Sequence, residues 1–100
     1  MSAYNVVRFR VKPGRDKDFI AKNQEMGRTK MRGFRKGALI KTGDRAYCFM
    51  AEWDSFDSIV KARPQMLANL DSMRDLLEDL GGGLGVTDPI SGEAVLEINP

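Results

Sequence analysis

Five side chains of this sequence have the types and spacing of a pocket for a flat, negatively charged molecule. Trp53, Phe49 and Tyr47 share one side of an expected strand, because side chains alternate between the two faces of a sheet. Phe9 should face them from the first strand, and Arg63 follows one short helix later. An indole supplies a stacking wall, a phenol a hydrogen bond, and a guanidinium a charge. We therefore predict that Trp53, Arg63, Tyr47, Phe49 and Phe9 bind a small aromatic ligand.

Each of these residues also has a purely structural interpretation. Trp53 can be a core residue at the end of a strand, and Tyr47 an ordinary strand aromatic. Arg63 can cap the end of a helix. The sequence identifies no residue that would move a proton, so the catalytic residues are unknown at this level.

The absence of histidine removes several kinds of chemistry at once. His-based triads, His-ligated zinc and His-ligated haem are excluded. The chain also lacks the GxGxxG, GxxxxGK and CxxC motifs, so we expect no metal and no cofactor. Cys48 is the single cysteine and can form no internal disulfide, which fits a reducing cytoplasm. The N-terminus lacks the apolar core of a signal peptide, and no apolar run is long enough to cross a membrane.

Hydrophobic periodicity predicts six elements, with turns at Pro13-Gly14, Gly43-Asp44 and Asp88-Pro89. Proline inside a helix removes a hydrogen bond and clashes with the preceding turn, so we expect a break at Pro64 that opens space for a ligand. The predicted strands are Tyr4–Val11, Phe34–Thr42, Ala46–Trp53 and Glu93–Ile98. The predicted helices are Arg15–Met26 and a split second helix, Ser55–Ala62 followed by Pro64–Leu80.

This βαββαβ order predicts one α+β domain over residues 1–100 with a ferredoxin-like fold. Its four-stranded antiparallel sheet would carry both helices on one face and leave the other face bare. The apolar residues that we assign to the bare face are Leu39, Cys48, Met50, Leu96 and Ile98. A second copy of the chain would cover them, so we expect a homodimer.

The charge distribution is uneven, with +9 in residues 1–50 and −7 in residues 51–100. Two such halves can match across an interface, or they can be two differently charged solvated faces. A basic segment, Gly27–Arg35, could bind a phosphate or a nucleic-acid backbone, but a solvated loop before an edge strand is the better explanation. It lacks the interleaved aromatics of RNA readers, so we expect neither a nucleic acid nor a membrane as partner.

Three short motifs resemble the antibiotic biosynthesis monooxygenase (ABM)-like family of the dimeric α+β barrel superfamily. They are the strand end Val11-Lys12-Pro13-Gly14, the strand-to-helix junction Glu52-Trp53-Asp54-Ser55, and Arg63-Pro64. Many members close the first strand with Pro-Gly and end the third strand with Trp-x-Ser. The resemblance covers nearly the whole chain in element order, and it marks the fold more specifically than an activity.

The resemblance implies a cofactor-independent monooxygenase acting on a phenol or hydroquinone with O₂. Trp53 matches the family's pocket tryptophan. Haem-degrading members use a histidine, a helix tryptophan and a strand asparagine, whose position falls near Val7; this chain has no histidine and no second tryptophan. Haem degradation is therefore not expected. The alternative is a non-catalytic small-molecule-binding or stress-response protein on the same scaffold.

Overall fold

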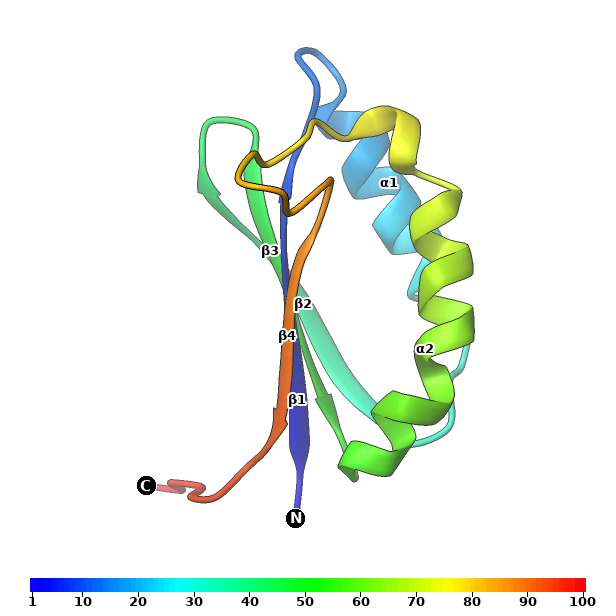
Figure 1. Cartoon of the computed structure of the whole chain (residues 1–100). Coiled ribbons are helices and arrows are strands. Elements are labelled where there is room, and N and C mark those ends of the chain that lie inside the picture. The colour runs from blue at the N-terminus through cyan, green and yellow to red at the C-terminus, as the bar shows by residue number, and fades with distance from the viewer.

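A four-stranded antiparallel sheet carries two helices on one of its faces (Figure 1). The strand order is β2-β3-β1-β4, so the first and third strands lie in the centre. This computed structural model describes residues 1–100 and confirms the predicted ferredoxin-like α+β fold. Its elements are β1 (Ala3–Arg10), α1 (Asp16–Met26), β2 (Phe34–Gly43), β3 (Ala46–Trp53), α2 (Phe56–Asp71), the 3₁₀ turn η1 (Arg74–Leu76) and β4 (Asp88–Glu93).

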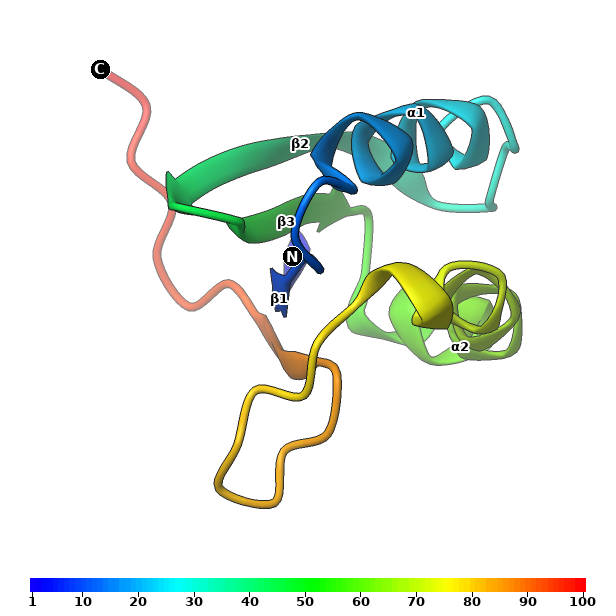
Figure 2. The ribbon, with the colours of Figure 1, turned by 90° about the horizontal axis from the view of Figure 1, so that it is seen from above.

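The helix-facing side of the sheet carries two separate buried clusters. One cluster lies around Phe19 of α1, whose ring centroid is 5.3 Å from those of both Phe9 and Tyr47. The other lies around Trp53 and includes Ile59 of α2. Phe49 is only half-buried and packs against both clusters. In the view from above, the two helices lie side by side over this face, with α1 toward β2 (Figure 2).

The predicted break at Pro64 is wrong, because α2 runs without interruption from Phe56 to Asp71 with the proline inside it. A proline in a helix deprives the carbonyl four residues earlier, here that of Val60, of its hydrogen bond. Pro64 is exposed and the Val60 side chain is 41% exposed, so water can take the place of the missing donor. The space that a broken helix would open is therefore absent.

The second helix also ends earlier than its leucine spacing predicts. The Ser72 hydroxyl donates to the carbonyl of Asn69 at 2.6 Å, and a 3₁₀ turn follows. Beyond it the backbone pairs with the end of β1: Lys12 N–H donates to Leu76 O, and Glu78 N–H donates to Arg10 O, each at 2.8 Å. These bonds replace helical ones, which is why Leu77 is extended. Neither helix has the length and apolarity needed to span a membrane.

The last strand lies five residues earlier than predicted. Asp88 and Pro89, expected to turn the chain, instead begin β4, which pairs with β1 so that Ile90 lies opposite Val6. An edge strand tolerates proline, and the Asp88 carboxylate accepts a hydrogen bond from Arg8 at 2.8 Å. The N–H of Ala94 donates to Ser2 O, and beyond that point β1 has no residue left to pair with. Residues 95–100 therefore leave the sheet.

The face without helices is only partly the one that the sequence predicts. Cys48 and Met50 lie on it, in register with Arg8 and Val6 of β1. Leu39 lies on the helix-facing side instead, opposite Phe49 and packed against the Phe19 cluster. Leu96 and Ile98 belong to the tail after β4 and are 74% and 80% exposed. The apolar centre of the bare face is formed by Val6, Ala38, Ile40, Cys48, Met50 and Ile90.

Candidate functional site

Trp53 lies at the end of β3, where the sheet leads into α2, and it is one of the most buried residues. Its indole Nε1–H donates to Asn5 Oδ1 at 2.7 Å. Asn5 is itself buried, on β1 opposite Ala51, so each polar group satisfies the other away from water. The sequence indicates that Asn5 shares this face, but the bond depends on a cross-strand register that it does not reveal.

Two phenylalanine rings extend the aromatic surface beside the indole. The Phe34 ring meets Trp53 edge to face, with centroids 5.3 Å apart and an angle of 79° between the rings. The Phe49 ring lies over Gly37 of β2, where an added Cβ would come within 2.8 Å of Phe49 Cζ. Glycine at this position therefore leaves room for the ring against β2. Phe34 is missing from the predicted site because only the strand register, which sets it opposite Trp53, brings it to the indole.

The structure brings only some of the five predicted binding residues together. Phe49 lies between Trp53 and the pair formed by Phe9 and Tyr47, which belong to the Phe19 cluster. Arg63 is exposed, and its guanidinium lies over the Phe56 ring at 5.8 Å from the centroid. Phe56 is two helical turns before Arg63, so this contact follows from the continuity of α2.

No acid or base stands beside the indole ready to move a proton. Asp54 is the nearest carboxylate in sequence, and it accepts a hydrogen bond from the Ser58 hydroxyl at 2.5 Å. That bond lowers the pKa of Asp54 against the opposing effect of desolvation, so the carboxylate is ionised at neutral pH. No group of three or more histidine, cysteine, aspartate or glutamate side chains converges in a way that could hold a metal ion. What this region offers is an apolar aromatic surface and one amide.

The Tyr47 hydroxyl is already engaged, because it donates to Asp16 Oδ2 at 2.6 Å and ties β3 to the first turn of α1. The bond to Asp16, together with desolvation, raises the pKa of Tyr47 above its ordinary 10.0. The folded protein therefore holds this proton more tightly than the unfolded chain does.

We expect Tyr47→Phe to reduce the free energy of unfolding by about 1 kcal/mol at neutral pH, the contribution of one hydrogen bond. A raised pKa gives stability that is complete below the unfolded pKa and is lost as the pH rises through the folded pKa. The difference between wild type and Tyr47→Phe should therefore shrink above pH 10.0. Urea unfolding of both proteins from pH 7 to 11 measures this difference in the free energy of unfolding. A difference that does not change with pH would contradict the hydrogen bond to Asp16.

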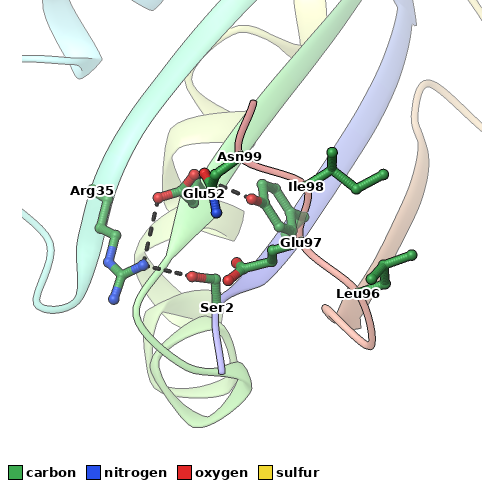
Figure 3. A pocket seen from close by; sticks show the side chains of 8 residues that line it. Ser2, Arg35, Glu52, Leu96, Glu97, Ile98 and Asn99 are labelled. Carbon is green, nitrogen blue, oxygen red and sulfur yellow. Dashed lines mark hydrogen bonds and ion pairs between the residues drawn. The ribbon is translucent and has the colours of Figure 1, made fainter.

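A surface hollow of about 430 Å³ lies on the opposite, bare side of the sheet, under the C-terminal tail (Figure 3). Arg35 bridges it, donating to Ser2 Oγ at 2.5 Å and pairing with Glu52 at 3.5 Å. The Tyr4 hydroxyl donates to Glu52, and desolvation with that bond raises the pKa of Tyr4. None of the five predicted residues lines this hollow. Its lining residues are Ser2, Tyr4, Arg35, Glu52, Leu96, Glu97, Ile98 and Asn99.

Comparison with known proteins identifies the fold. No family model matches this chain, and no curated protein matches it in sequence. Among solved structures, SnoaB, a cofactor-independent oxygenase from Streptomyces nogalater, matches with a TM-score of 0.69 at 19% identity, over 99% of this chain and 98% of its own. A candidate antibiotic biosynthesis monooxygenase from Bordetella bronchiseptica has a TM-score of 0.75 at 18% identity, and the match covers 95% of this chain and 98% of that one. Another from Chloroflexus aurantiacus has a TM-score of 0.70 at 18% identity, and the match covers 99% of this chain and 98% of that one.

These neighbours confirm the ABM-like resemblance at the level of the fold. The chain is an α+β protein of the ferredoxin-like architecture that the antibiotic biosynthesis monooxygenases use. The match covers nearly the whole length of each chain, so it rests on the arrangement of the elements rather than on one motif. At identities this low a shared fold does not carry an activity with it.

Proposed function

We propose that the protein is a cofactor-independent monooxygenase acting on a small aromatic substrate of the phenol or hydroquinone type. The observation that supports this most is the full-length match to SnoaB, over 99% of the present chain. The aromatic surface built by Trp53, Phe34 and Phe49 suits a flat substrate. We also propose that the protein acts as a homodimer in the cytoplasm.

The proposed substrate position lies between the two buried clusters, on the helix-facing side of the sheet. The apolar side chains there are half-buried rather than sealed: Phe49 and Val7 on the sheet, and Met66 and Leu70 on α2. In this proposal the substrate ring contacts Phe49, with Trp53, Phe9 and Tyr47 behind it. Entry requires α2 side chains to move aside, because Trp53 is 1% exposed in the closed arrangement.

In this reaction the main task of the protein is to bind and orient the substrate. A phenolate can give an electron to O₂ directly, so that no metal or flavin is needed. If a ring CH₂ becomes a carbonyl, one oxygen atom of O₂ enters the product and the other leaves as water. The protein would exclude bulk water, hold the ring flat and favour the phenolate, for which Arg63 of α2 is the proposed cation.

We expect O₂ uptake with naphthol- or anthrone-type substrates, and quenching of the Trp53 fluorescence when they bind. Trp53 is the only tryptophan, so the signal reports on this region alone. Arg63→Ala should raise KM several-fold with little change in melting temperature, because the side chain is exposed and forms no ion pair. An oxygen electrode and a fluorescence titration measure the two effects.

Arg28→Ala is the matched control, since Arg28 is another exposed arginine without an ion pair and lies in the loop after α1. It should leave uptake and quenching unchanged. If a broad panel of phenols gives no O₂ uptake and no quenching of the Trp53 fluorescence, the proposal is refuted.

A second candidate function is non-catalytic binding of a small molecule on the same scaffold. It is favoured by the lack of an acid and base pair near Trp53 that could transfer a proton. The Asp54 carboxylate is ionised at neutral pH, and Asn5 Oδ1 accepts the hydrogen bond of the indole. A binder would quench Trp53 and raise the melting temperature, and the ligand would be recovered chemically unchanged.

A further inference from the structure

The basic loop between α1 and β2 contributes only Met31 to the packing of the core, and its charged residues face away from the proposed substrate position. It lies against one side of α2, and between the two there is a hollow of about 220 Å³. We propose that this hollow binds a small oxyanion of the phosphate-monoester class. The lining residues are Thr29, Lys30, Met31 and Arg32 from the loop, and Ser58, Lys61, Ala62 and Gln65 from α2.

The loop is held in place at its C-terminal end. Gly33 has a φ of +85°, which favours glycine, and an added Cβ would come within 2.3 Å of Ser58 Oγ. Its carbonyl accepts a hydrogen bond from Asp54 N–H at 2.9 Å. The Met31 side chain packs against the Trp53 cluster. These contacts give the hollow a defined wall on the loop side.

Positive charge dominates the lining. Lys30 and Arg32 form no ion pair, and no carboxylate is among the eight lining residues. Lys61 pairs with Asp57 at 2.9 Å, but both side chains are at least 70% exposed, so that pair is weak and readily exchanged for a ligand. The Asp54 carboxylate is turned to Ser58. An anion in the hollow would therefore meet three cations at close range.

The donors around these cations define the class of ligand. A guanidinium fork, two ammonium groups and the Thr29 hydroxyl can donate hydrogen bonds to a phosphate. The Gln65 amide donates to Asn69 Oδ1 at 3.0 Å and keeps its second N–H for a ligand. Met31 and Ala62 add an apolar patch that suits a short carbon group. The volume is below the roughly 300–1,000 Å³ of whole drug-sized sites, so a head group fits it better than a large molecule.

A nucleic-acid backbone is less well matched to this surface. Single-stranded nucleic acid is held by aromatic side chains on which the bases stack, beside a basic groove. No aromatic residue lines the hollow, and on the side of α2 that carries Lys61 the next residues, one and two turns on, are the uncharged Gln65 and Asn69. The lining therefore favours a small anion.

An NMR titration of the ¹⁵N-labelled full-length protein tests the proposal, with inorganic phosphate in one series and phenyl phosphate in another. Ionic strength is held constant with sodium chloride, because salt screens exposed charges. We expect saturable shifts, one site per chain, at Lys30, Arg32, Lys61 and Gln65. Equal affinities for the two ligands would show that the phosphate group alone is bound. Tighter binding of phenyl phosphate would show that the apolar patch contacts the carbon group as well.

Lys30→Gln/Arg32→Gln should weaken binding about tenfold or more, because it removes two of the three cations that line the hollow. Gln65→Glu, an exposed substitution, should do the same by placing a carboxylate in the hollow. Lys12→Gln/Lys17→Gln removes the same charge from exposed positions elsewhere and should leave binding intact. Equal weakening in that control, shifts that never saturate, or tighter binding of single-stranded RNA to the same residues would overturn the proposal.

Discussion

Replacing Trp53 with alanine should destabilise the protein by about 3–5 kcal/mol, the usual cost of removing a large buried aromatic side chain. Trp53 is 1% exposed and is the largest fully buried side chain, so little rearrangement is available to fill the cavity. Small domains are stable by only about 5–15 kcal/mol, so the substitution would remove a large part of the total. Urea unfolding followed by circular dichroism, at fixed protein concentration, measures the effect.

A double-mutant cycle separates the hydrogen bond of Trp53 from its packing. Trp53→Phe keeps most of the ring and leaves Asn5 Oδ1 without its indole donor, while Asn5→Ala removes the acceptor. Combining the two should cost about 1 kcal/mol less than the sum of the single changes.

Asn23→Ala is the control for this cycle, since the amide of Asn23 donates to Phe19 O on α1 and has no bond to Trp53. Combined with Trp53→Phe it should be additive. A coupling of zero between Asn5 and Trp53 would mean that the buried bond does not contribute in solution.

The regular parts of the fold could be predicted from local patterns, and the errors arise where distant contacts decide. The alternation from Ala46 to Trp53 predicts a hairpin with β2 that the structure confirms, although its turn lies at Asp44-Arg45, one residue later than predicted. The prediction that Leu39 lies on the bare face is wrong, because β2 has register shifts at both ends and a bulge changes which face a residue takes. The last strand depends on where β1 begins, which no pattern near Asp88 reveals.

The candidate site was predictable to the same extent. Alternation along β3 predicts that Trp53 and Phe49 share a face, and they do. The partners Asn5 and Phe34 come from neighbouring strands, so only the pairing register brings them to the indole. The predicted helix break beside Arg63 is wrong, because a solvated carbonyl makes Pro64 tolerable within a continuous helix, so Arg63 lies on the surface of α2 rather than at the end of a short helix.

The bare face of the sheet has an apolar centre and charged ends. Its centre is apolar, with Met50 40% and Ile90 66% exposed. Charged groups lie at its two ends, the pair of Arg8 with Asp88 at one and the pair of Arg35 with Glu52 at the other. An apolar centre with a polar rim is the usual anatomy of a protein interface, and a two-fold axis through the centre would cover both faces at once.

We therefore expect light scattering at micromolar concentration to give about twice the chain mass of 11.2 kDa, and Met50→Glu to give a monomer. The substitution places a carboxylate at the centre of the bare face, where a second copy would bury it without a partner. Leu67→Glu makes a similar change at a position on α2 that is 57% exposed, and it should leave the mass unchanged. Since Met50 lies on the sheet face away from the helices, Met50→Glu should leave the fold of the separated chain intact by circular dichroism. A wild-type protein that is already monomeric, or a Met50→Glu variant that pairs as tightly as wild type, would show that this face is not the contact surface.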